Sequence, residues 1–201
     1  MNADRNTSQD ALPLRLETDE PSAVGAAPAR FTVPGDGTRL YDVVPSPLGE
    51  LLLISDGAAL TGLYMNPHEQ LPSDGQGGRE WRREPAALRE TAEQLAAYFA
   101  GELREFSLPL APRGTEFQRT VWRALTTVPH GRTATYGGIA RSIGRPNASR
   151  AVGMANNRNP ISIVVPCHRV IGADGAMVGY GGGVSRKESL LGLEKGAALK
   201  A

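Results

Sequence analysis

The sequence predicts an α+β protein, in which a small N-terminal antiparallel sheet with one helix precedes a mostly helical C-terminal domain. Residues 39–65 contain three short apolar runs, LYDVV, ELLLIS and ALTGLYM, separated by the turn sequences PSPLG and SDGA. Residues 88–99 then repeat apolar side chains at helical spacing, and residues 115–156 contain three further helical segments with short breaks. The order of these elements, strands first and helices after, is typical of the α+β class.

The first half divides at changes in composition. Residues 1–30 are polar, lack periodicity and predict a flexible tail, and residues 31–112 predict the sheet domain. Polar, Gly-rich residues 66–84 predict a loop, and residues 103–114 predict an irregular link to a second domain at 113–201. The helix between them carries an apolar stripe and stops at a glycine: Leu88, Ala92, Leu95, Phe99 and Gly101.

Capping patterns mark the helices of the second half. Thr115 and Gln118 form a capping box for a helix whose apolar face holds Phe117, Val121, Leu125 and Val128. A helix over residues 136–143 is broken by GRPN, and Asn147 is a good N-cap for the next one, to about residue 156. This pair predicts a helix-turn-helix, although many αα-hairpins have the same pattern. Small residues on its second helix favour close approach to another surface, or equally tight packing against the core: Ala148, Ser149, Ala151, Gly153 and Ala155.

Two further elements complete the second half. The apolar run at residues 161–165, stopped by Pro166, predicts a buried strand that leads into a loop. Ser185 and Glu188 form a second capping-box pattern, which predicts a final helix carrying Leu190, Leu191 and Leu193.

Composition excludes several classes of site. The 201 residues include one cysteine and three widely spaced histidines, which excludes an internal disulfide and a multi-cysteine zinc site and gives no sign of a metal cluster. No apolar segment reaches the roughly 20 residues of a membrane span, and the polar, acidic N-terminus does not resemble a secretory signal. These features predict a protein of the reducing cytoplasm that is not bound to a membrane.

The net charge of +1 hides an asymmetry along the chain. Residues 113–173 contain nine arginines and one acidic residue, whereas residues 1–112 contain nine basic and seventeen acidic residues. The basic block has no lysine, and the planar guanidinium group suits phosphate and stacks on bases, so it favours a nucleic-acid partner. An arginine-rich, high-GC genome explains the same composition equally well.

The single cysteine, in the sequence PCHRV, is the leading candidate for chemistry. A lone cysteine is usually an inert core residue, but Pro166 places Cys167 where a strand ends, and His168 and Arg169 are poor neighbours for an apolar core. A nearby imidazole or guanidinium favours the nucleophilic thiolate. Downstream, Tyr180 precedes three glycines, Gly181 to Gly183, whose backbone could approach a ligand or form a mobile hairpin tip.

These residues carry a family resemblance. NPISIVVPCHRVIG followed by GYGGG, and preceded by TYGGIA and RAVGMANNRNP, resembles the methylated-DNA–protein-cysteine methyltransferases, which are O6-alkylguanine-DNA alkyltransferases. The motifs match in order and spacing over residues 115–196. Over residues 39–101 only the strand-strand-strand-helix pattern resembles the family's N-terminal, ribonuclease H-like domain, and residues 1–30 lie outside the resemblance.

The resemblance implies a role for particular residues. Cys167 is the nucleophile, His168 deprotonates it through a water, Glu194 orients His168, and Asn159 holds the turn between the recognition helix and the active-site strand. On DNA, Arg150 replaces the extruded base and Tyr136 crowds the 3′ phosphate, while small residues such as Ala151 and Gly153 fit the recognition helix into the minor groove. Tyr180 packs on the flipped guanine, the amide of Gly181 donates to O6, and the carbonyl of Val170 accepts from the amino group.

The implied reaction is direct reversal of alkylation damage, possible only after the base leaves the duplex. The alkyl group of O6-alkylguanine moves irreversibly to the cysteine, so one chain repairs one lesion, without metal or cofactor, and activity on O4-alkylthymine is left open. The partner is damaged double-stranded DNA, bound by a monomer, with cooperativity on DNA left open. Two other classes are weighed: a DNA-binding regulator with a structural Cys167, and a cysteine hydrolase using Cys167, His168 and Glu194.

Overall fold

The central sheet contains the predicted meander. The computed structural model of the chain describes residues 29–65, 81–177 and 180–197. Within them, β2 (Arg39–Val44), β3 (Leu51–Ser55) and β4 (Leu60–Tyr64) pair antiparallel in that order. Every residue of β3 is buried, because both faces of this inner strand are covered. The predicted α+β class is confirmed.

Three short strands extend the meander to six strands, in the order β1-β6-β4-β3-β2-β5. They are β1 (Arg30–Phe31), β5 (Trp81–Arg83) and β6 (Pro109–Leu110), and all their pairings are parallel. The sheet is therefore mixed, and the predictions of a loop at 81–83 and of irregular structure at 109–110 were wrong. Strands this short show no alternation in sequence, and they form only because a distant partner strand is present. The tail was predicted over residues 1–30, but Arg30 belongs to β1, so the end of that prediction was wrong. Residues 1–28 and the remaining loop at 66–80 lie outside the described residues.

The predicted helix of the first half is confirmed as α2 (Arg89–Phe99), which follows a 3-10 turn at Pro85–Leu88. Its Leu95 and Tyr98 enter the core. The helix stops at Gly101, where φ is +78°, a conformation that favours glycine.

The second half opens with three helices, α3 (Glu116–Leu125), α4 (Tyr136–Ser142) and α5 (Ser149–Asn157). The capping box of α3 is confirmed: the Gln118 amide N–H donates to Thr115 Oγ1 at 3.2 Å, and the Thr115 amide N–H donates to Gln118 Oε1 at 2.8 Å. The α4–α5 hairpin is present. Asn147 does not cap it, because α5 begins one residue later with Ala148 at the N-cap and no side-chain cap bond.

The last elements are a 3-10 turn at Cys167–Arg169, strand β8 (Val170–Ile171), which pairs in parallel with β7 (Ala134–Thr135), and α6 (Val184–Glu194). The predicted second capping box was wrong. Gly183, with φ of +88°, occupies the N-cap of α6, and Ser185 already lies inside the first turn. Leu190 and Leu191 are buried as the helical prediction requires.

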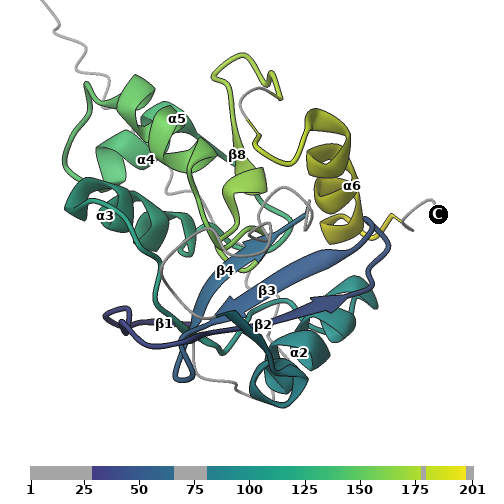
Figure 1. Cartoon of the computed structure of the whole chain (residues 1–201). Helices are drawn as coiled ribbons and strands as arrows, with labels where there is room; N and C mark the ends of the chain where they lie inside the picture. Colours follow the sequence, from purple (N-terminus) through teal and green to yellow (C-terminus); the bar gives the residue numbers. More distant parts are fainter. Residues whose placement is uncertain (1–28, 66–80, 178–179, 198–201) are drawn as a thin grey trace, which may run out of the picture.

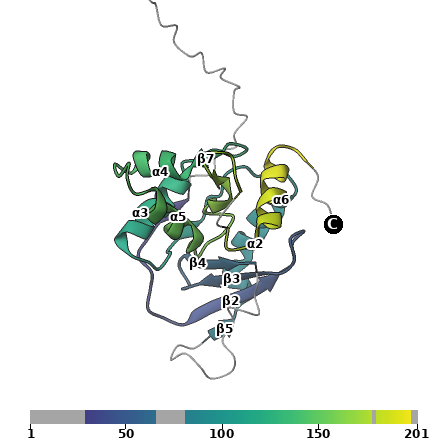
Figure 2. The ribbon, with the colours of Figure 1, turned by 90° about the horizontal axis from the view of Figure 1, so that it is seen from above.

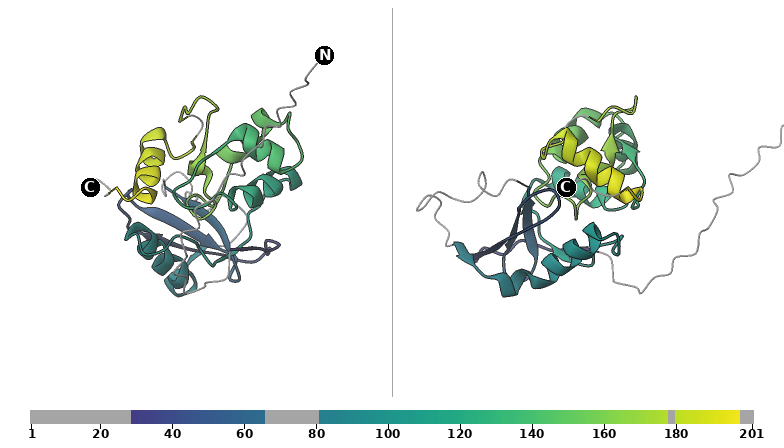
Figure 3. Two further views of the ribbon diagram at one scale, coloured as in Figure 1. Left: turned by 180° about the vertical axis from the view of Figure 1, so that it is seen from behind. Right: turned by 90° about the vertical axis from the view of Figure 1, so that its right-hand side faces the viewer.

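The two halves share one hydrophobic core. Helices α3 to α6 gather on one side of the molecule, with β4 nearer to them than β2 and β5 (Figures 1 and 2). The view from behind and the side view show the same grouping, with α2 in the lobe that contains the sheet (Figure 3). The core cluster runs from Leu53 and Leu63 in the sheet to Trp122 in α3 and Val165. No helix among the described residues is long and apolar enough to cross a membrane.

Candidate active site

The segment before the cysteine is a tight turn, so the predicted strand at 161–165 was wrong. The Val165 amide donates to the Ile161 carbonyl at 3.0 Å, which closes the turn. Only Ile161 forms a bridge to the sheet, with Leu63. Ile163 has φ of +70°, which for a β-branched residue costs about 1–3 kcal/mol. The apolar side chains are buried as predicted, but the turn directs the chain back toward the cavity that contains Cys167.

Asn159 holds this turn and contacts the thiol. Its Nδ2 donates to the Val165 carbonyl at 2.8 Å and to Cys167 Sγ at 3.1 Å, and its Oδ1 accepts from the Ile161 amide at 3.0 Å. Asn156, on the last turn of α5, donates from Nδ2 to the Cys167 carbonyl at 3.3 Å. The helix that precedes the turn is therefore bonded directly to the backbone of the cysteine.

Cys167 is buried, with only 3 % of its surface exposed. Burial raises the pKa of Cys167, against the opposing effects of the Asn159 hydrogen bond and the positive charge of Lys187. A thiol with a raised pKa remains protonated at neutral pH, so nucleophilic attack requires a base.

A buried ionic cluster lies directly behind the cysteine. From the sequence, His168 and Arg169 are poor neighbours for an apolar core. Both are nevertheless buried, because each bonds to Glu194. Glu194 Oε1 lies 2.8 Å from His168 Nε2, and the Arg169 guanidinium donates Nε and NH2 hydrogens at 2.9–3.1 Å. The Gly131 amide and the Tyr98 hydroxyl also donate to this carboxylate.

The charge states of the cluster follow from these bonds. Burial acts to raise the pKa of Glu194, but the hydrogen bonds and charges of His168 and Arg169 outweigh it and hold this pKa far below its ordinary value. Burial lowers the pKa of His168, with Glu194 acting in the opposite direction. An ionised carboxylate only accepts, so His168 Nε2 carries the hydrogen and Nδ1 carries the lone pair. Among the described residues Nδ1 has no hydrogen-bond partner, which makes it the basic atom of the pair.

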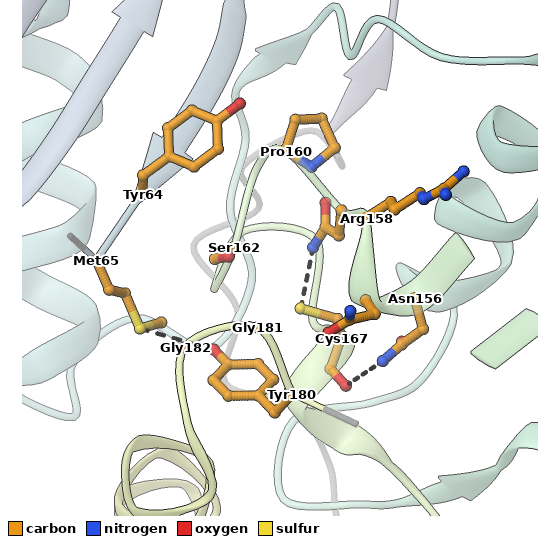
Figure 4. A pocket seen from close by; sticks show the side chains of 12 residues that line it. Tyr64, Met65, Asn156, Arg158, Pro160, Ser162, Cys167, Tyr180, Gly181 and Gly182 are labelled. Carbon is orange, nitrogen blue, oxygen red and sulfur yellow. Dashed lines mark hydrogen bonds between the residues drawn. The ribbon is translucent and has the colours of Figure 1, made fainter. Parts of the chain in front are cut away.

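Cys167 opens onto a cavity of about 230 Å³. Both halves of the chain line it: Tyr64 and Met65 come from the end of β4, whereas Tyr180 and Gly181 come from the segment before α6 (Figure 4). Tyr180 is buried, and its hydroxyl lies 3.8 Å from the Met65 sulfur. A Cβ atom at Gly182 would lie 2.8 Å from the Tyr180 ring, so glycine is required there. The cavity presents the Cys167 thiol together with two aromatic rings, Tyr64 and Tyr180, and glycine backbone.

Beside the cavity, α5 exposes a face that contains Arg150, Ala151 and Met154, the last with 59 % of its surface accessible. Val152 and Ala155 point inward, and the Ala155 carbonyl accepts from Trp122 Nε1 at 2.8 Å. Both predicted uses of the small residues in α5 are therefore present: Ala155 packs against the core, and Ala151 lies on an open face.

Tyr136 and Gly153 lie where α4 and α5 meet, and a Cβ atom at Gly153 would be 3.8 Å from the Tyr136 ring. Burial and the neighbouring Cys167 both raise the pKa of Tyr136, so its hydroxyl is in the electrostatic range of the thiol. Of the nine arginines in the basic block, the structure exposes all except Arg119, which is half-buried, and Arg169.

Val170, like His168 and Glu194, does not line the cavity. Val170 is buried in β8 outside the cavity lining, and its carbonyl accepts from Lys187 Nζ at 2.5 Å. Lys187 is fully buried and was missed by the sequence analysis. The signal was available, because residues 187, 190, 191 and 194 share one face of a helix, and that stripe already contained two leucines.

Comparisons with known proteins identify this arrangement. The family model for the 6-O-methylguanine DNA methyltransferase, DNA binding domain, matches residues 116–196, and that for its ribonuclease-like domain matches residues 39–112. The methylated-DNA–protein-cysteine methyltransferase of Mycobacterium tuberculosis is 52 % identical over 158 residues, which cover 79 % of this chain and 93 % of that protein. Its counterpart from Methanosarcina acetivorans is 50 % identical over 155 residues, covering 77 % and 97 %.

Solved structures agree with the sequence comparison. The crystal structure of Mycobacterium tuberculosis OGT in complex with DNA matches with a TM-score of 0.70 and 51 % identity, covering 78 % of this chain and 93 % of that one. The O6-methylguanine-DNA methyltransferase from Pyrococcus kodakaraensis matches with a TM-score of 0.52 and 25 % identity, covering 78 % and 99 %. The family suggested by the sequence is confirmed: the chain belongs to the methylated-DNA–protein-cysteine methyltransferases.

Proposed function

We propose that this protein repairs O6-alkylguanine in double-stranded DNA by taking the alkyl group onto Cys167. The C–O bond at guanine O6 breaks, a C–S bond to Sγ forms, and the departing guanine anion takes up a proton. The thioether product has no good leaving group, so each chain acts once. The observation that carries the proposal is the position of the Cys167 thiol, which lines the cavity and is followed in the chain by the buried His168–Glu194 pair.

His168 generates the nucleophile. The raised pKa of Cys167 means that the thiol must lose its proton to a base before attack. His168 Nδ1 accepts this proton through a water molecule, and the ionised Glu194 stabilises the imidazolium that results. The Asn159 amide and the buried Lys187 ammonium then stabilise the thiolate.

The exposed face of α5 extrudes the base. Removing a base from the stack costs a few kcal/mol, and a side chain that fills the vacancy lowers this cost. Arg150 supplies that side chain, Ala151 and Gly153 allow close approach to the minor groove, and Tyr136 crowds the 3′ phosphate. The bond from Asn156 to the Cys167 carbonyl keeps this face in register with the thiol.

The cavity then receives the base. The ring of Tyr180 packs against the guanine, and the amide of Gly181 donates to O6, where negative charge develops. The carbonyl of Val170 accepts from the exocyclic amino group through its second lone pair, because the first is taken by Lys187. One chain carries the complete proposed site, which supports a monomer as the repairing unit, and a nucleophilic thiol favours the reducing cytoplasm.

The test is stoichiometric transfer. We expect a duplex containing O6-methylguanine to add one methyl group per chain, on the peptide that contains Cys167, as measured by mass spectrometry. Cys167→Ala should bind the same duplex and leave it methylated. Repeated turnover would instead indicate a cysteine hydrolase, and sequence-specific binding without transfer would indicate a regulator.

A further inference from the structure

The carboxylate of Glu194 is bonded from both halves of the chain. Tyr98 lies on α2, in the sheet lobe, and its side chain is fully buried. Its hydroxyl lies 2.8 Å from Glu194 Oε1, the same oxygen that lies 2.8 Å from His168 Nε2. The two residues that share this oxygen are 70 positions apart, and neither is part of the cavity lining.

The direction of the tyrosine bond is determined by the carboxylate. Glu194 is ionised and only accepts, so Tyr98 donates. Burial, followed by the charge and hydrogen bond of Glu194, raises the pKa of Tyr98 well above its ordinary value. The hydroxyl therefore keeps its proton at every pH at which the protein works. A donor on Oε1 draws negative charge from the oxygen that faces the imidazole.

We propose that Tyr98 is a positioning residue for the alkyl transfer, which orients Glu194 Oε1 toward His168 and takes up part of its charge. This inference rests on the proposed function, in which neutral His168 receives the thiol proton. With the hydroxyl present, the carboxylate stabilises the imidazolium less strongly, and His168 stays neutral to lower pH. The sheet lobe thus contributes a hydrogen bond to the reaction as well as a cavity wall.

Several other titratable groups lie near Glu194 and His168. Arg169 donates three bonds to the carboxylate, and the half-buried His130 packs edge-on to the Tyr98 ring with centroids 6.2 Å apart. Lys187 and Arg169 both act to lower the pKa of His168, and Cys167 adjoins it in the chain. Arg104 acts to lower the pKa of His130. Each of these groups is unchanged when a single oxygen atom is removed from Tyr98.

Tyr98→Phe tests the proposal, because the ring contacts with Phe99 and Phe106, at centroid distances of 5.4 and 5.3 Å, survive. The measurement is the single-turnover rate of Cys167 alkylation by free O6-benzylguanine as a function of pH. We expect the acid limb, where His168 becomes protonated, to move up by roughly half a pH unit or more, since one hydrogen bond to the charged partner is lost.

Two comparisons isolate the hydroxyl. Phe106→Leu loosens the same packing without removing a donor, and its acid limb should coincide with that of the wild type. Replacing Tyr98 alone by 3-fluorotyrosine keeps the shape of the side chain and makes its hydroxyl a stronger donor, so the acid limb should move to lower pH. The fluorotyrosine protein decides the question if Tyr98→Phe does not fold. Coincident limbs in all proteins, or a uniform loss of rate without a shift, would overturn the role of Tyr98. Failure of the wild type to take a methyl group from the O6-methylguanine duplex would instead refute the proposed function, and that duplex replaces O6-benzylguanine as the substrate if the wild type does not accept the benzyl group.

Discussion

Asn159→Ala should damage both the stability of the turn and the reactivity of the thiol. The change removes the bonds to the Val165 carbonyl and to Cys167 Sγ, and it leaves the buried Ile161 amide without its acceptor. The Val165 carbonyl keeps its bond from the Cys167 amide at 2.8 Å. Two lost bonds at about 1 kcal/mol each and one orphaned donor at about 1–3 kcal/mol predict a loss of about 3–5 kcal/mol in the free energy of unfolding.

Urea unfolding of the wild type and Asn159→Ala measures the first effect. The effect on thiol reactivity is measured by the pH dependence of Cys167 alkylation by O6-benzylguanine. Because the Asn159 hydrogen bond lowers the pKa of the thiol, the part of the profile in which the thiol itself loses its proton, the alkaline limb, should move to higher pH in the variant. Asn147→Ala is the matched control, because Asn147 is exposed and caps no helix; it should change stability by less than about 0.5 kcal/mol. A loss below about 1 kcal/mol in Asn159→Ala, with an unchanged alkaline limb, would refute this account of the turn.

Three further outcomes are expected. Arg150→Ala should slow repair of duplex DNA about 10-fold or more while reaction with free O6-benzylguanine is unchanged, because only the duplex requires a wedge; equal losses on both substrates, or the same loss in Arg104→Ala, would contradict the wedge. The stabilisation from Glu194, whose folded-state pKa is depressed below its ordinary 4.5, is complete above about that pH and is lost on further acidification. The difference in unfolding free energy between wild type and Glu194→Gln should therefore shrink below pH 4.5, and a difference that grows there would be inconsistent with an ionised Glu194. Binding of undamaged duplex should weaken steeply with salt, because the exposed arginines displace counterions; salt-independent affinity would remove them from the interface.

Local signals in the sequence determined the elements that depend on neighbouring residues. The helices α2 and α3 formed where apolar spacing and the Thr115 capping box predicted them, and the meander formed where apolar runs alternate with turn sequences. The motif around Cys167 identified the family, because several motifs recur in one order and spacing. These features need no information about distant parts of the chain.

The tertiary structure decided everything that depends on a distant partner. The apolar run at 161–165 was predicted as a strand from its composition, but only Ile161 bridges to the distant sheet, at Leu63, and Asn159 bonds fold the run into a turn. The burial of His168 and Arg169 depended on Glu194, a partner that no local pattern reveals, since His168 and Glu194 are 26 residues apart. Tyr98, which bonds to the same carboxylate, is 96 residues from it. Charge inside a core is stable only when its partners are in place, and those partners are brought together only when both halves pack.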